Sequence, residues 1–120
     1  MERQAQVGKE KVREYLPTRR VNRTVKARWE DQTFYLTVGF YDEELKRPGE
    51  VFADTGKTPQ AVQQVIADAC ILISVALQFG VSAADLGKSL ARFDDGKPYT
   101  IIGVICDLLS RTDWTKENKL

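Results

Sequence analysis

The chain has 120 residues and a mass of 13.6 kDa, which suits one domain with its own core and is too little for a catalytic domain plus a regulatory one. Hydrophobic residues make up 42% and charged residues 29% of the sequence. No apolar run approaches the ~20 residues that span a bilayer, and the polar N-terminus lacks a secretory signal. We therefore expect a cytoplasmic protein that does not enter a membrane.

The net charge of +1 is spread unevenly along the chain. Residues 1–28 hold nine Lys and Arg against three Asp and Glu, whereas the remainder holds nine against fourteen. This pattern predicts a flexible basic arm over residues 1–15. Beyond the arm, Arg19, Arg20 and Arg23 are candidate phosphate ligands. Nucleic acid is an unfavoured partner, because dedicated nucleic-acid-binding domains carry a net basic charge.

Three strands are predicted first. Residues 21–29 and 33–41 alternate with period two, and the three residues between them are short enough for a hairpin loop. On the second strand, the even-numbered residues from Phe34 to Phe40 share one face, which is expected to be core. A turn at Pro48-Gly49 and a short strand over residues 50–54 complete an antiparallel meander.

Three helices are predicted next, which makes the fold α+β. Thr58 can cap the first helix, with Pro59 at its first position. This helix ends at a left-handed cap on Gly80, and its second half is apolar nearly all round. We therefore expect a buried helix and a homo-oligomer formed through Gln60–Phe79. Two shorter helices follow, one opening at Ser82 and ending near Phe93, the other carrying the apolar residues from Ile101 to Leu109.

The chemistry of the chain is limited. It has no histidine, which excludes histidine-based zinc ligation and general base catalysis. Cys70 and Cys106 fall in apolar helical runs with no second ligand at metal spacing, so they are interpreted as core thiols. We expect no cofactor, no metal site and no enzymatic activity. Residues 111–120 are predicted to be a polar tail, in which Trp114 is typical of a docking contact.

Two segments are candidate ligand sites. Gly56-Lys57-Thr58 resembles the end of a P-loop, but the required earlier glycine is replaced by Val51, so an NTPase is not expected. The helix start, with Lys57 and Thr58, can still hold an anion, or it is a plain strand-to-helix turn. In the second segment a guanidinium could grip phosphate and a ring could stack on a base, or the loop only caps a helix. Its candidate residues are Arg92, Phe93, Asp94 and Lys97.

Several segments together resemble the TSCPD family over residues 16–110: Leu16-Pro17-Thr18-Arg19-Arg20, Phe34 to Tyr41, Pro48 to Phe52, Asp54-Thr55-Gly56-Lys57, Ile73 to Val81 and Gly103 to Leu109. That domain occurs at the C-terminus of adenosylcobalamin-dependent ribonucleotide reductases and in small stand-alone proteins of bacteria and phages. The resemblance implies a small antiparallel sheet with packed helices, and an accessory module of nucleotide metabolism or recognition. It does not imply reductase catalysis, because the catalytic barrel and the cysteine-bearing motif of the family are missing.

We therefore expect a non-catalytic oligomeric module that binds a phosphorylated nucleotide or a nucleotide-derived signal. Two alternatives remain open. Size and layout are similar to phage sponges that sequester cyclic nucleotide immune signals, which is an analogy of fold alone. The chain could also be a protein-interaction subunit that docks on a reductase or another host enzyme through its basic N-terminal segment and Trp114.

Overall fold

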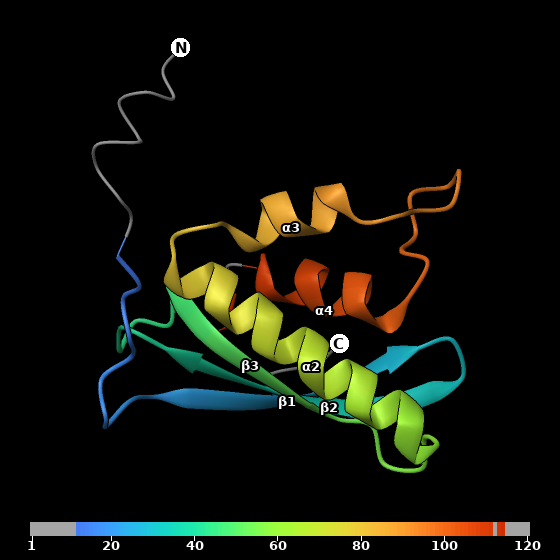
Figure 1. Cartoon of the computed structure of the whole chain (residues 1–120), viewed down its shortest axis with the longest axis horizontal. Helices are drawn as coiled ribbons and strands as arrows, with labels where there is room; N and C mark the ends of the chain where they lie inside the picture. Colours follow the sequence, from blue (N-terminus) through green and yellow to red (C-terminus); the bar gives the residue numbers. More distant parts are fainter. Residues whose placement is uncertain (1–11, 112, 115–120) are drawn as a thin grey trace.

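The computed structural model describes residues 12–111, 113 and 114. Three strands form one antiparallel sheet in the order β1-β2-β3, and three helices follow in sequence (Figure 1). This is the predicted α+β architecture. The elements are β1 (Asn22–Trp29), β2 (Gln32–Phe40), β3 (Pro48–Asp54), α2 (Gln60–Gln78), α3 (Ala83–Ser89) and α4 (Ile101–Leu109).

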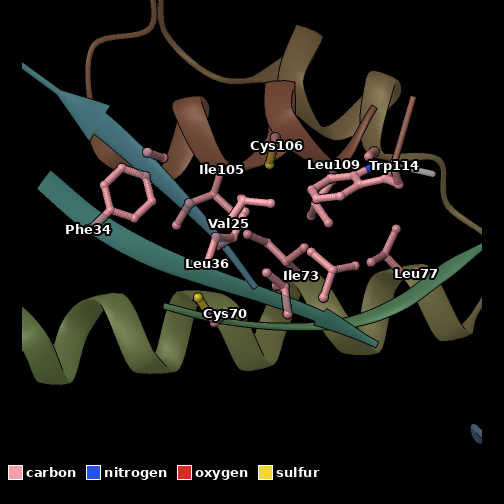
Figure 2. Packing of buried hydrophobic residues seen from close by; sticks show 14 of the residues in the cluster. Val25, Phe34, Leu36, Cys70, Ile73, Leu77, Ile105, Cys106, Leu109 and Trp114 are labelled. Atoms are coloured by element: carbon pink, nitrogen blue, oxygen red, sulfur yellow. The ribbon is translucent and has the colours of Figure 1, made fainter. Parts of the chain in front are cut away.

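One face of the sheet is the base of the core. The alternating pattern of β2 places Phe34, Leu36, Val38 and Phe40 on this face, and all four are 0% exposed, as predicted. Figure 2 shows Ile105 and Leu109 of α4 on one side of the cluster and Ile73 and Leu77 of α2 on the other. α3 packs on α4, and Figure 1 shows it on the side of α4 away from the sheet.

α2 lies along the free edge of β3 and bonds to it through polar side chains. The N–H of Val51 donates to Ser74 Oγ at 3.0 Å, and Gln78 Nε2 donates to the carbonyl of Gly49 at 2.8 Å. Both groups of β3 point away from β2 and would otherwise lack a partner at the edge of the sheet. The helix thus closes an edge that could pair with another chain.

Within the single chain, α2 is buried along one side only. Its buried residues are Ile66, Cys70, Ile73, Leu77 and Gln78. In contrast, Ile71 is 58% and Leu72 70% exposed. By length and composition, α2 is also the one helix in the described part of the chain that could cross a membrane, a test that core helices of soluble proteins pass as well.

Three helix boundaries can be compared with prediction. Gly80 has a φ of 93° and Ser82 accepts from the N–H of Asp85, so both predicted caps are confirmed. The predicted Thr58 cap is wrong: Pro59 is the N-cap of α2 and makes no side-chain bond, because the Thr58 hydroxyl donates to the carbonyl of Thr55 instead.

The predicted end of α3 near Phe93 is also wrong. α3 ends at Ser89, and Leu90 is extended. The chain then forms a short hairpin in which Arg92 pairs with Pro98, and Gly96 at its tip has a φ of 89°. The extended backbone at Leu90 ends the helix before this hairpin begins.

Both ends of the described chain are attached to the domain. Trp114, predicted to lie in a polar tail, is 1% exposed and meets the ring of Phe40 edge-on at 5.9 Å. At the other end, the N–H of Glu14 donates to the carbonyl of Gln78 at 2.8 Å, and the Tyr41 hydroxyl donates to the carbonyl of Glu14. Trp114 therefore packs within the chain, and Glu14 of the predicted arm is bonded to Gln78 of α2 and to Tyr41, which follows β2.

Candidate ligand-binding site

Side chains bond to several backbone groups of the turn before α2. Asp54 Oδ1 accepts from the N–H of Gly56 at 3.1 Å, which places a carboxylate three residues before the N-cap of α2. Gln63 Nε2 donates to the carbonyls of Gly56 and Thr58, and Gln32 Nε2 donates to Thr58 Oγ1. Lys57 is exposed. A carboxylate at the Gly56 N–H opposes the binding of a second anion to that group.

The guanidinium of Arg92 holds its own hairpin in place. It pairs with both oxygens of Asp107, at 2.6 and 3.1 Å, and donates to the carbonyls of Gly96 and Gly87. The hydrogen bond to Asp107 raises the pKa of Arg92 above its usual value. A guanidinium that already makes four hydrogen bonds has little left for a phosphate.

The remaining predicted residues of this hairpin are on its surface. The rings of Phe93 and Tyr99 lie 4.5 Å apart with an angle of 34°, and both are about half exposed. Asp94 and Lys97 are exposed at the tip. Among the described residues, no hydrogen bond or ion pair joins this hairpin to Lys57, and in Figure 1 the hairpin lies above α4 and the turn before α2 lies below it. The structure therefore does not bring the two predicted sites together.

The three predicted arginines of the N-terminal region differ in environment. Arg19 is exposed beside a hollow that also contains Tyr41. Arg20 pairs with Glu50 at 2.7 Å and donates to the carbonyl of Pro17. Arg23 is half-buried, and its register opposite Val38 places it on the covered face of the sheet. Arg19 and Arg20 thus line the same hollow, whereas Arg23 lies apart from it on the covered face of the sheet.

A pocket of about 350 Å³ lies between α2 and β3. This volume is within the range of small-molecule sites, which are mostly apolar with a few polar groups. Its apolar wall comes from both elements, and its polar groups lie at one end. The lining residues are Arg13, Glu50, Val51, Phe52, Ala53, Ala67, Cys70, Ile71, Ser74, Val75 and Gln78.

Phe52 gives this pocket an exposed aromatic wall. Its register opposite Thr37 places it on the face of the sheet that no described helix covers, and it is 57% exposed. Tyr35 is on the same face, 48% exposed and diagonal to Phe52 across β2 and β3. A phenyl ring held on a strand with one face in solvent is a surface on which a flat ligand can stack.

Arg13 gives the pocket a positive end. Its Nε donates to Gln78 Oε1 at 2.7 Å, and its guanidinium lies 4.5 Å from the centre of the Tyr15 ring. Within residues 12–111, 113 and 114, its two terminal nitrogens make no hydrogen bond or ion pair. Glu50 lines the same end, but its charge is neutralised by Arg20. The net charge of this end therefore favours an anion.

Cys70 lines the pocket without being a nucleophile at neutral pH. Burial raises the pKa of its thiol to about 11, so the thiolate that would attack a ligand is scarce. Among the described residues, no group of three His, Cys, Asp or Glu side chains could hold a metal ion.

Sequence reasoning missed both Phe52 and Arg13. Phe52 follows Val51 in a short strand, where either residue could have been the buried one. Arg13 lies in the segment interpreted as a flexible arm. One signal was present: Ser74 and Gln78, polar and four residues apart in an otherwise apolar half-helix, marked the side of α2 that faces the pocket.

Comparison with known protein families gives a match over most of the chain. The family model described as TSCPD domain matches residues 8–112, which is most of the chain and begins inside the predicted arm. No curated protein and no solved structure matches the chain. The match agrees with the attachment of Arg13 and Glu14 to the domain.

Proposed function

Because the chain belongs to the TSCPD domain family, we propose that it is a non-catalytic module that binds a phosphorylated nucleotide or a nucleotide-derived signal in the pocket between α2 and β3. One observation carries the proposal. The exposed ring of Phe52 and the guanidinium of Arg13 line the same pocket. An aromatic wall and a cation with free donors are what a base and a phosphate require.

The two residues have separate roles in this proposal. The base stacks on Phe52, an interaction worth ~1–3 kcal/mol. The phosphate accepts from the terminal nitrogens of Arg13, which Gln78 holds through Nε. Charge-assisted bonds of this kind are about twice as strong as neutral ones. The apolar side chains of Ile71 and Val75 close the opposite wall.

Several features support binding without turnover. The sequence has no histidine, and the thiol of Cys70 is protonated at neutral pH. Both described cysteines are free and buried. We further propose that the protein acts in the cytoplasm, where free thiols remain reduced. Cyclic nucleotides fall within the ligand class, so sequestration of a cyclic nucleotide signal is one use that this pocket could serve.

The test is a thermal-shift screen against nucleoside monophosphates, diphosphates, triphosphates and cyclic nucleotides at millimolar concentration. A binder raises Tm by mass action. Phe52→Ala and Arg13→Ala should each remove the shift. Phe93→Ala is a matched control, since Phe93 is 53% exposed and distant in the fold. Lys57→Ala should leave the thermal shift unchanged. Loss of the shift in this variant would indicate that the phosphate binds at the turn before α2. No shift with any nucleotide would sink the proposal.

A further inference from the structure

α2 carries an exposed apolar seam at heptad spacing. Its members follow one another at intervals of three, four, three, four and three residues: Val62, Val65, Ala69, Leu72, Ala76 and Phe79. None of them is buried in the chain, and Leu72 at 70% and Val65 at 61% are among its most exposed apolar side chains. Alternating intervals of three and four residues are the pattern by which two helices pair along a common seam.

This seam is separate from the surfaces that α2 already uses. Ile66, Cys70, Ile73 and Leu77 face the core, and Ser74 and Gln78 face β3. In Figure 1 α2 lies at the front of the molecule, with no other element over its length. The seam is therefore free to receive another helix.

The sizes of the seam residues favour one arrangement. When the seam is laid against a reversed copy of itself, each small residue meets a large one: Ala69 meets Leu72, Ala76 meets Val65, and Val62 meets Phe79. A parallel copy would instead place alanine against alanine and leucine against leucine. Alternation of small and large residues fills the space between two helices evenly, and the antiparallel arrangement also opposes the two helix dipoles.

We propose that α2 pairs antiparallel with α2 of a second copy of this chain, through these six residues. The seam contains no charged residue, and the one charge on α2, Asp68, is outside it. Self-pairing therefore buries no charge. The N-terminal residues 1–11 are a poor alternative cover, because their only apolar side chains are Met1, Ala5 and Val7.

The first test is the mass in solution, measured by light scattering over micromolar to millimolar concentrations. The wild-type chain should approach twice its 13.6 kDa as concentration rises. Leu72→Asp should keep it at the mass of one chain. Ile71→Asp is the matched control: the neighbouring residue is 58% exposed and off the seam, and this variant should still pair. Circular dichroism checks that both variants are folded.

The second test reports the orientation. Ala69→Cys and Leu72→Cys are made in separate chains, which are mixed and oxidised mildly. Antiparallel pairing brings these two positions together, so the mixture should form a disulfide-linked species several-fold faster than either variant alone. Faster linkage within each variant alone would indicate a parallel pair and overturn the arrangement. A monomer at every concentration, or a pair that survives Leu72→Asp, would overturn the proposal.

Ligand binding and self-association can fail independently. Phe52 and Arg13 are not in the seam, and Leu72 does not line the pocket. Loss of nucleotide shifts in a chain that still doubles its mass would reject the proposed function alone. Nucleotide shifts in a chain that remains monomeric would reject the helix pair alone.

Discussion

The Val51 N–H donates to Ser74 Oγ at 3.0 Å, and the same hydroxyl donates to the carbonyl of Cys70 at 2.8 Å. One side chain thus joins the edge of β3 to a turn of α2. Val51 is 1% exposed, so water cannot replace this partner. Together with the bond from Gln78 to Gly49, this contact fixes α2 beside β3 and so shapes the pocket between them.

Ser74→Ala should therefore lower the free energy of unfolding by ~1–3 kcal/mol, the usual effect of leaving a buried N–H unpaired. Guanidinium denaturation measures it. Ser89→Ala is the control, because the Ser89 hydroxyl donates to the carbonyl of Asp85 on an exposed surface. That variant should change stability by less than ~0.5 kcal/mol. If the two changes lowered the free energy of unfolding equally, the contact at the edge of β3 would contribute no more stability than an exposed hydroxyl bond.

The sheet could be predicted from the sequence because the residues that determine each strand and hairpin are close together in the chain. Alternation from Phe34 to Phe40 fixed both the strand and its buried face, and the short loop after Trp29 fixed the antiparallel neighbour. The place of α2 could not be predicted in the same way. An apolar helix can lie over the face of a sheet or along its edge, and the polar residues Ser74 and Gln78 find their partners only in the folded chain.

The candidate site was harder to predict for the same reason. Arg92 has the side chain expected of a phosphate ligand, but its carboxylate partner is Asp107, 15 residues further on. Whether a cation is free or paired depends on such distant contacts. Arg13 shows the opposite case: a residue assigned to a flexible arm is held beside the pocket by Gln78.

Arg92→Ala should loosen the hairpin from Ala91 to Tyr99. The guanidinium bonds to both Gly96 in the turn and Asp107 on α4, so its removal detaches the tip from the helix. Limited chymotrypsin digestion should then cut after Phe93 and Tyr99, the exposed aromatic residues of the hairpin, several times faster than in the wild type. Asp107→Asn should act in the same direction. Asp85→Asn, which breaks only the exposed pair with Lys88 at 3.7 Å, should leave the cleavage rate unchanged.

Trp114→Ala should cost ~3–5 kcal/mol of stability, the range for removing a buried aromatic side chain. Trp114→Phe should cost less, since its indole N–H is buried without a hydrogen-bond partner among the described residues and the ring contact with Phe40 can be kept. Thermal unfolding measures both changes. A wild-type Tm in Trp114→Ala would show that the segment after α4 is not part of the core.

The two cysteines should resist thiol reagents in the folded protein. Burial raises the pKa of Cys70 to about 11 and also raises that of Cys106. At pH 8 an aromatic disulfide reagent should therefore react slowly with the native chain, and two thiols should react at once in guanidinium.

Because the folded pKa of Cys70 exceeds its ordinary value of 9.0, the unfolded state loses its proton first. This contribution to stability is complete below pH 9 and should be lost between pH 9 and 11. In Cys70→Ala, only one thiol should react in guanidinium. The loss of stability between pH 9 and 11 should also be smaller than in the wild type. Rapid reaction of both thiols in the native chain at pH 8 would contradict their burial.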